Sequence, residues 1–203
     1  MVCRAAEARP ATSGQLVLGG VTACSVGAVL ARRPGVSPLE RRCYRALNGL
    51  PGAAFPPAWV VMQLGSLGGP LVPAVGALRA GRPDLARRIV LAGGVTWSGA
   101  RLVKRAVRRA RPGAATELSR VLGREQRGLG YPSGHAAVAA SVAAVAAPEA
   151  PPPWRPVLWA LAALVGACRV YVGAHLPLDV AGGLTFGAAV GGALRGFAVT
   201  GRG

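Results

Sequence analysis

Two long stretches of this chain contain no charged residue, and they constrain its fold more than any other feature. The first runs from Pro10 to Ala31 and the second from Ala46 to Leu78. Each is long enough to cross the hydrocarbon core of a bilayer as a helix, which takes about 20 apolar residues. We read the first as a retained helix, because it is long for a signal peptide and no Ala-x-Ala cleavage site follows it. The second is expected to contain one spanning helix.

The kind of hydrophobic residue also favours a membrane protein. Hydrophobic residues make up 52% of the chain, yet only three of them are phenylalanine. A soluble core of this size normally needs larger side chains to fill it, whereas small residues let helices approach closely in lipid. Gly183, Gly187 and Gly191 recur at four-residue spacing. They therefore predict one helix face that packs tightly against a neighbouring helix.

Several shorter apolar segments end in polar residues, and they become long enough to span only if those ends share a wet cavity. We therefore expect an all-α integral membrane bundle of about six transmembrane helices, formed by a single domain over residues 1–203. The helices are expected at 14–32, 57–80, 84–109, 133–148, 154–171 and 177–198. Residues 38–47 mix arginines with apolar residues, which predicts a short helix at the membrane surface or, alternatively, a solvated loop.

The chain carries a net charge of +17, with 24 basic and 7 acidic residues. Such a balance implies an anionic partner, which can be a nucleic acid, an acidic membrane surface or a phosphorylated substrate. Because the apolar runs favour a membrane, we expect a bilayer among the partners, and no nucleic acid. The four cysteines lie far apart and are read as small hydrophobes. Two histidines and seven scattered acids do not readily build a two-metal site, so no metal and no cofactor is expected.

Both histidines of the chain lie in polar clusters that suit phosphoryl transfer. His175 precedes Asp179 by four residues. A carboxylate there accepts from one ring nitrogen and leaves the other free to attack phosphorus. His135 ends a Pro-Ser-Gly-His segment and is left to protonate the leaving oxygen, for which a pKa of about 6.5 is suitable. The N–H groups of Ser133 and Gly134 open the helix of His135 and can bind an anion.

A phosphate ester also needs its charged oxygens neutralised during hydrolysis. Lys104, Arg108 and Arg111 are spaced by four and seven positions, so they are predicted to share one face of a helix. Arg169 closes another predicted helix. Cations at these positions can hold a phosphate dianion from several sides.

Together these clusters resemble the signature of the type 2 phosphatidic acid phosphatase superfamily. That signature is Lys-x6-Arg-Pro, then Pro-Ser-Gly-His, then Ser-Arg-x5-His-x3-Asp. Here it reads as Lys104 through Arg111-Pro112, Pro132 through His135, and Cys168-Arg169 through His175 and Asp179. Cys168 stands where serine is usual. The motif core covers residues 104–179, and the six-helix pattern extends the likeness to most of the chain.

The resemblance implies a metal-independent lipid phosphatase with a phosphohistidine intermediate on His175 and acid catalysis by His135. It further implies phosphate contacts from Lys104, Arg111, Ser133, Gly134 and Arg169. It also implies a multi-pass protein of the plasma membrane, with the active site on the outer face and both termini in the cytoplasm. The distribution of charge disagrees, since most basic residues then lie outside, against the positive-inside rule. We keep the outward-facing site as the expectation.

Other readings remain open at this point. Haloperoxidase-type enzymes share the motifs but are soluble, which the apolar runs argue against. By analogy the substrate is expected to be a polyprenyl phosphate or diphosphate of envelope lipid metabolism, with phosphatidic acid or phosphatidylglycerol phosphate as alternatives. A basic membrane protein that only binds anionic lipids would not explain where the histidines fall. The tryptophans are read as interface anchors or packing. The remaining arginines near the motifs are read as headgroup contacts or a solvated rim, namely Arg41, Arg42, Arg45, Arg105, Arg109, Arg120, Arg124 and Arg127.

Overall fold

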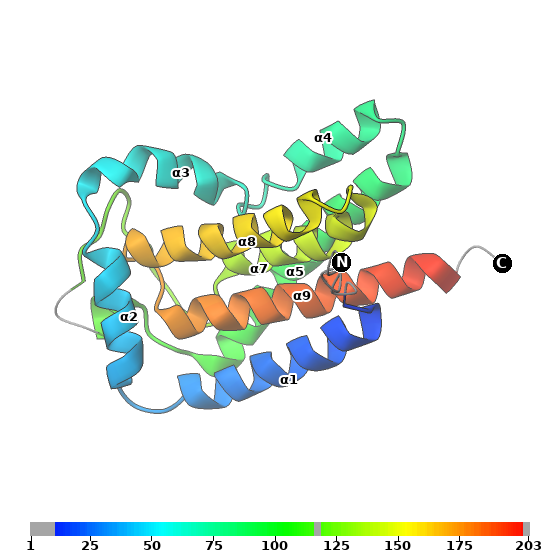
Figure 1. Cartoon of the computed structure of the whole chain (residues 1–203). Coiled ribbons are helices and arrows are strands. Elements are labelled where there is room, and N and C mark those ends of the chain that lie inside the picture. Colours follow the sequence, from blue (N-terminus) through cyan, green and yellow to red (C-terminus); the bar gives the residue numbers. More distant parts are fainter. Residues whose placement is uncertain (1–10, 116–118, 201–203) are drawn as a thin grey trace, which may run out of the picture.

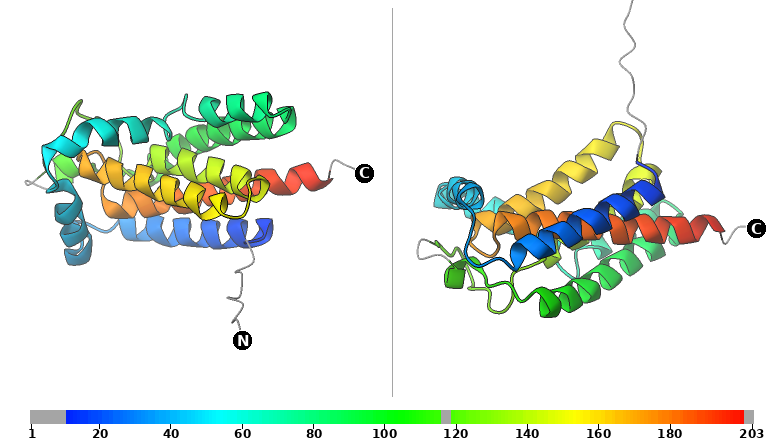
Figure 2. Two further views of the ribbon diagram at one scale, coloured as in Figure 1. Left: turned by 45° about the horizontal axis from the view of Figure 1, so that its top comes forward. Right: turned by 90° about the horizontal axis from the view of Figure 1, so that it is seen from below.

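The computed structural model describes residues 11–115 and 119–200, with the last five of these by backbone only. Over these ranges the chain forms helices and no strand, which confirms the predicted all-α class. The longer helices run lengthwise beside one another, and one short helix, α2 (Pro38–Asn48), lies across an end of the bundle (Figure 1). Figure 2 shows the same arrangement from two further sides.

The first and last helices lie side by side. Helix α1 spans Ser13–Ala31 and packs along α9, which spans Pro177–Thr200. A capping box opens α1: the Thr12 side chain accepts from the Gln15 backbone, and the Gln15 side chain accepts from Thr12. Both helices are long and apolar enough to cross a membrane by length and composition. The predicted ranges 14–32 and 177–198 are therefore confirmed as helices.

Helix α7 (Gly134–Ala146) occupies the centre of the bundle. It is packed by α5 (Pro83–Val107), α8 (Trp154–Tyr171) and α9, and most of its alanines are fully buried. The glycines of α9 face it closely. A Cβ atom at Gly187 would collide with the Ala137 carbonyl, and one at Gly191 would lie 2.6 Å from the Ser141 carbonyl oxygen. The predicted tight packing face on α9 is therefore confirmed.

The prediction of one continuous helix over residues 57–80 is wrong. The segment forms two shorter helices, α3 (Phe55–Gln63) and α4 (Leu71–Arg79), separated by a turn. In the turn, the Ser66 hydroxyl donates to the Gln63 carbonyl (2.7 Å) and accepts from the Gly69 amide (3.1 Å). A Cβ atom at Gly65 would collide with the carbonyl of His135. Gly65 thus lets this turn approach the start of α7, and Pro70 stands at the N-cap of α4.

Helix α2 confirms the helical alternative for residues 38–47. Its buried residues are Glu40, Tyr44 and Asn48, which lie four positions apart on one face. That face packs against α8 and α9. The Tyr44 hydroxyl shares a hydrogen bond with Ser119 (2.7 Å), and the Asn48 amide donates to the carbonyls of Arg120 and Tyr171 (2.8 Å each). Helix α2 is therefore attached to the end of the bundle by specific polar contacts.

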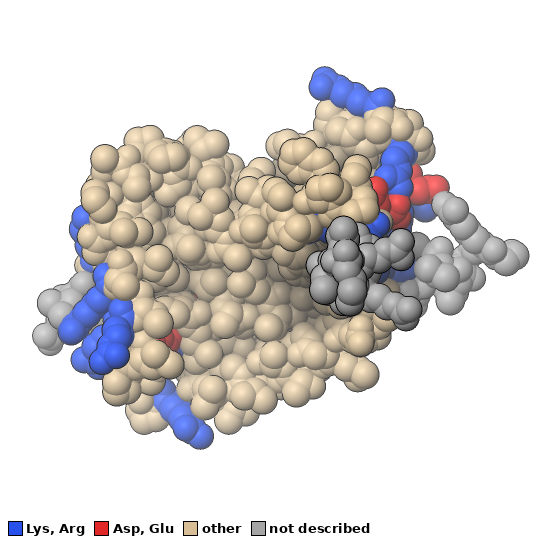
Figure 3. Space-filling view, in the orientation of Figure 1, with Lys and Arg blue, Asp and Glu red and all other residues tan. Residues whose placement is uncertain are grey.

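The face of the bundle seen in Figure 3 divides into three zones. Figure 3 shows basic side chains gathered towards the two ends and a wide band without charge between them. Large apolar side chains are exposed on several helices. They include Leu18, Val21, Val26 and Val29 on α1, Val72 and Val75 on α4, Leu91 and Val95 on α5, and Leu161 and Leu164 on α8. An exposed apolar surface of this extent suits contact with lipid.

Candidate active site

The predicted site residues converge at the end of the bundle that carries α2. They come from the last turns of α5 and α8, the start of α7, the segment before the short helix α6 (Pro112–Ala115), and the loop that leads into α9. Lys104, Arg111 and Arg169 each act electrostatically on both His135 and His175. Residues separated by up to 71 positions in the motif core therefore form one cluster of charge around the two imidazoles.

The two residues of the predicted dyad face each other. His175 lies in the loop before α9 and is buried, and its Nδ1 is 3.4 Å from Oδ2 of the fully buried Asp179. The same carboxylate oxygen accepts from the Leu176 amide at 3.0 Å. The Asp179 backbone carbonyl accepts from the Ser133 amide (2.8 Å), which ties the start of α9 to the start of α7. The dyad is thus held by backbone contacts as well as by its own spacing.

Arg111 determines the tautomer of His175. Its Nη1 lies 3.4 Å from His175 Nε2 and also donates to the Ala174 carbonyl at 2.6 Å. Because a guanidinium only donates, Nε2 must be the acceptor and the ring proton belongs on Nδ1, towards Asp179. Burial and the nearby cations, Lys104 foremost, hold the pKa of His175 well below its ordinary value. The imidazole is therefore neutral at pH 7, with its lone pair at Nε2.

Several buried donors in this cluster have no hydrogen-bond partner among the described residues. They are Ser133 Oγ, Arg111 Nε and Arg169 Nε. Lys104 differs, since its ammonium donates to the carbonyls of residues 129–130 at 3.0 and 2.6 Å. Buried unpaired donors are costly, and Gly134 adds a helix N-terminus beside them. Three cations and unpaired donors in one place fit an anion rich in oxygen, such as a phosphate.

His135 lies against an aromatic residue that the sequence reading did not place at the site. Its ring packs edge-on against Trp97, with ring centroids 5.8 Å apart and an interplanar angle of 63°. The guanidinium of Arg101 lies 5.7 Å from the centre of the Trp97 ring. Trp97 precedes Lys104 by seven residues, or about two helical turns, and that spacing was the available signal for a shared face of α5.

Two predictions about the arginines after α5 are wrong. The helix ends at Val107, and Arg108 adopts a left-handed conformation (φ 57°), so the predicted face shared by Lys104, Arg108 and Arg111 does not form. Arg108 is exposed, and its Nε donates to the Arg105 carbonyl. Arg109, predicted as part of a solvated rim, is buried between Glu40 and Asp179. Because the backbone turns left-handed at Arg108, this residue faces solvent and Arg109 faces the interior.

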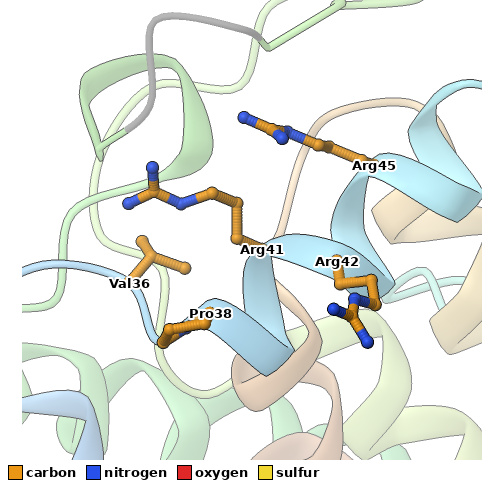
Figure 4. Close-up of a pocket in the computed structure, with 5 residues that line it drawn as sticks. All are labelled: Val36, Pro38, Arg41, Arg42 and Arg45. Atoms are coloured by element: carbon orange, nitrogen blue, oxygen red, sulfur yellow. The ribbon is translucent and has the colours of Figure 1, made fainter.

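A surface pocket of about 500 Å³ lies along α2 and is lined by Val36, Pro38, Arg41, Arg42 and Arg45. Figure 4 shows the side chains of Arg41 and Arg45 extending to one side of the helix and that of Arg42 pointing away from them. None of the predicted catalytic or phosphate-binding residues lines this pocket. The prediction that these arginines contact lipid headgroups therefore stays a prediction.

Comparison with known proteins gives one family and two similar structures. A family model described as the PAP2 superfamily matches residues 87–200, which include every motif residue from Lys104 to Asp179. The first transmembrane PAP2 type phosphatidylglycerolphosphate phosphatase from Bacillus subtilis is 20% identical, with a TM-score of 0.75 over 92% of this chain and 97% of its own. LpxE of Aquifex aeolicus is 25% identical, with a TM-score of 0.70 over 79% of this chain and 96% of its own. No curated protein matches the sequence.

Proposed function

Because the chain belongs to the PAP2 superfamily, we propose that it is a membrane phosphatase that hydrolyses a lipid phosphate or diphosphate without a metal. The observation that carries the proposal is the convergence of three basic side chains, two histidines and one buried carboxylate at one end of the bundle. Basic side chains neutralise the phosphate oxygens in this scheme, which is the task that a metal ion performs in other hydrolases.

In the first step, Nε2 of His175 attacks phosphorus while the proton on Nδ1 faces Asp179. The P–N bond forms as the bond from phosphorus to the leaving oxygen breaks. His135 gives its proton to that oxygen, so the lipid departs as an alcohol, or as a monophosphate when the substrate is a diphosphate. Lys104, Arg111 and Arg169 stabilise the charge on the transferring group, together with the donors of Ser133 and Gly134.

In the second step, water attacks the phosphohistidine from the side that the leaving group vacated. His135 is now neutral and accepts a proton from this water as its oxygen bonds to phosphorus. The P–N bond breaks, its electron pair returns to Nε2 of His175, and inorganic phosphate leaves. His135 is protonated again, and both histidines have returned to their starting states.

The surface of the bundle supports the location that we propose. The uncharged band and the two apolar helices α1 and α9 support a multi-pass protein of the plasma membrane. The active site then lies at one membrane face, which we assign to the extracytoplasmic side although that end is the more basic one. A single cysteine near the C-terminus of a cysteine-free variant tests the orientation. Labelling by an impermeant thiol reagent in intact cells would overturn it.

The substrate we favour is a polyprenyl phosphate or diphosphate of envelope lipid metabolism. Phosphatidic acid and phosphatidylglycerol phosphate are the alternatives, and the latter belongs in any test because the similar Bacillus subtilis protein is named for it. These lipids share a phosphate on a hydrophobic leaving group, which suits a cationic site at the end of an apolar bundle. The choice among them has to come from measured rates.

The deciding experiment measures phosphate release by detergent-purified protein from a panel of these lipids in excess chelator. The His175→Ala variant is assayed beside it. We expect chelator-resistant release that vanishes in the variant, and the best lipid names the substrate class. Equal release by both proteins would contradict the mechanism. Binding of anionic lipid vesicles without any turnover would favour the alternative of a basic, non-enzymatic membrane protein.

A further inference from the structure

Helix α2 reaches the catalytic dyad through Glu40, which lies outside the three motifs, and through Arg109, one of the six unspecified positions between Lys104 and Arg111. We infer that Glu40 of α2 and Arg109 are positioning residues, which hold the Asp179 carboxylate so that only one of its oxygens serves His175. This inference rests on the proposed function, because it assigns the two residues a role in the same reaction.

The contacts form a continuous network. Arg109 Nη1 donates to Asp179 Oδ1 at 2.9 Å and to Glu40 Oε1 at 3.0 Å, and its Nη2 donates to Glu40 Oε2 at 2.6 Å. The exposed fractions of the three side chains are 7% for Arg109, 8% for Glu40 and 0% for Asp179. Charge-assisted hydrogen bonds at these distances and this burial are strong and geometrically specific.

The division of the acceptors explains why Glu40 is needed. Arg109 uses a single nitrogen on Asp179, and that nitrogen takes Oδ1. Oδ2 is left to Nδ1 of His175 and to the Leu176 amide. If Glu40 did not engage Nη2, the guanidinium could turn both nitrogens to Asp179 as a bidentate fork. Arg109 would then compete with His175 for the oxygen that orients the imidazole.

Glu40 also binds the first turn of α9, the helix that carries Asp179 of the dyad. Its Oε1 accepts from the amide of Leu178 at 2.9 Å. Leu178 is the second residue of α9, and amides of a first helical turn have no partner within their own helix. A negative charge at this end is favourable for the helix dipole. One carboxylate on α2 therefore fixes both Arg109 and the start of α9.

The opposite reading is that Glu40 and Arg109 only stabilise the fold. Removing one member of a buried ion pair does destabilise proteins, so loss of stability alone cannot separate the two readings. A role in orienting the dyad makes a narrower claim. It requires that the loss appears in kcat and that it depends on the presence of Asp179.

The test compares Glu40→Gln with wild type and with a matched control, Glu149→Gln. Glu149 also pairs with arginines, but at the other end of the bundle. We expect Glu40→Gln to lower kcat by about 10- to 100-fold, with KM changed by less than about threefold. Glu149→Gln should leave both parameters unchanged. Equal kcat for Glu40→Gln and wild type would overturn the inference.

A double-mutant cycle with Asp179→Asn, read as single-turnover phosphohistidine formation, tests whether Glu40 acts through Asp179. We expect Glu40→Gln to cost less than about threefold in the Asp179→Asn background. A loss by the same factor in both backgrounds would show a general structural effect and would contradict the inference. If Glu40→Gln does not yield folded protein, Glu40→Asp replaces it in the same cycle, since it keeps the carboxylate and withdraws it by one methylene.

Imidazole NMR decides the question without substrate, because the chain has only two histidines. We expect Glu40→Gln to shift the ring ¹⁵N signals of His175 and to leave those of His135 in place. Unchanged His175 signals would overturn the inference. Absence of phosphate release by wild type would instead contradict the proposed function, and the NMR result would still decide the role of Glu40.

Discussion

The two ends of the bundle carry ion-pair clusters of opposite design. At the α2 end, one arginine lies between two carboxylates, and all three side chains are buried. At the other end, one carboxylate, Glu149, lies between Arg82 and Arg88, with exposed side-chain fractions of 29%, 41% and 21%. In our inference, the first cluster fixes the orientation of the Asp179 carboxylate, which water would otherwise disorder. The second is open to solvent and joins η2 (Ala147–Glu149) to the start of α5.

The difference agrees with the proposal that the charges at the α2 end serve the reaction, whereas those at the far end belong to the solvent-exposed surface. Ion pairs exposed to solvent contribute from zero to about 1 kcal/mol, because water and salt screen them. Buried charges are costly to desolvate, so they persist where geometry matters more than stability. The first three of the following predictions therefore pair a change at the α2 end with a change at the far end, and the fourth concerns the far end alone.

The largest difference is expected for the proposed nucleophile. His175→Ala should lower kcat by at least about 10⁴-fold, because it removes the side chain that carries the phosphoryl group in the proposed mechanism. Arg88→Ala at the far end should retain the wild-type rate. Steady-state phosphate release at saturating lipid measures both. Residual turnover of His175→Ala within tenfold of wild type would remove the basis for assigning chemistry to the α2 end.

The next effect is expected at the carboxylate of the dyad. Asp179→Asn keeps the shape of the side chain but cannot favour the Nδ1–H tautomer of His175, so kcat should fall by about 10²- to 10⁴-fold. Glu149→Gln makes the same chemical change at the far end and should leave kcat unaltered. Burst-phase measurement of phosphohistidine formation locates the loss in the first step. Normal formation followed by slow hydrolysis would contradict the assignment.

A smaller effect is expected where only the shape of a cation changes. Arg169→Lys keeps the charge but loses the planar fork that binds two phosphate oxygens, so kcat/KM should fall by about tenfold. Arg82→Lys should have no effect on rate. Competitive inhibition by inorganic phosphate offers a second readout. If Arg169 binds phosphate, Arg169→Lys should weaken this inhibition together with kcat/KM. An unchanged inhibition constant in Arg169→Lys would exclude Arg169 from the phosphate site.

The smallest effect concerns stability at the far end. Burial alone would raise the pKa of Glu149, but hydrogen bonds and charges from Arg82 and Arg88 lower it below the ordinary 4.5. Its contribution to folding is therefore present above pH 4.5 and lost as the pH falls through the lowered pKa. Wild type should exceed Glu149→Gln in stability by less than about 1 kcal/mol near neutral pH. The difference in Tm should vanish in acid, and a difference that grows in acid would reverse the sign assigned here.

The candidate site could be predicted where short-range pattern and chemistry coincide. His135, His175 and Asp179 could be singled out because few residue types suit the tasks proposed for them and because the spacing of the motifs is specific. Most of the helices could be predicted because uncharged runs of small apolar residues strongly favour helices that pack in a membrane. The turn between α3 and α4 had a local signal in Gly65, which was outweighed by the absence of charge over the whole segment.

Arg109 and Glu40 could not be found in the same way. Arg109 is buried because the backbone turns left-handed one residue before it, and no pattern in the arginine-rich sequence predicts which residue takes that conformation. Glu40 reaches the site from a helix 69 positions before Arg109 along the chain. Its importance depends on tertiary contacts of α2, which local periodicity does not contain.

The packing of helix α7 restricts how the sequence of this protein can evolve. Apart from His135, its side chains perform no proposed chemistry, and the helix is built almost wholly of alanine, valine and glycine. Because glycines of α9 pack directly against its backbone, nearly every larger side chain on those contact faces would clash with the neighbouring helix. The sites most intolerant of mutation should therefore include chemically inert alanines. The proposed catalytic acid, His135, is carried by the part of the chain that we expect to vary least.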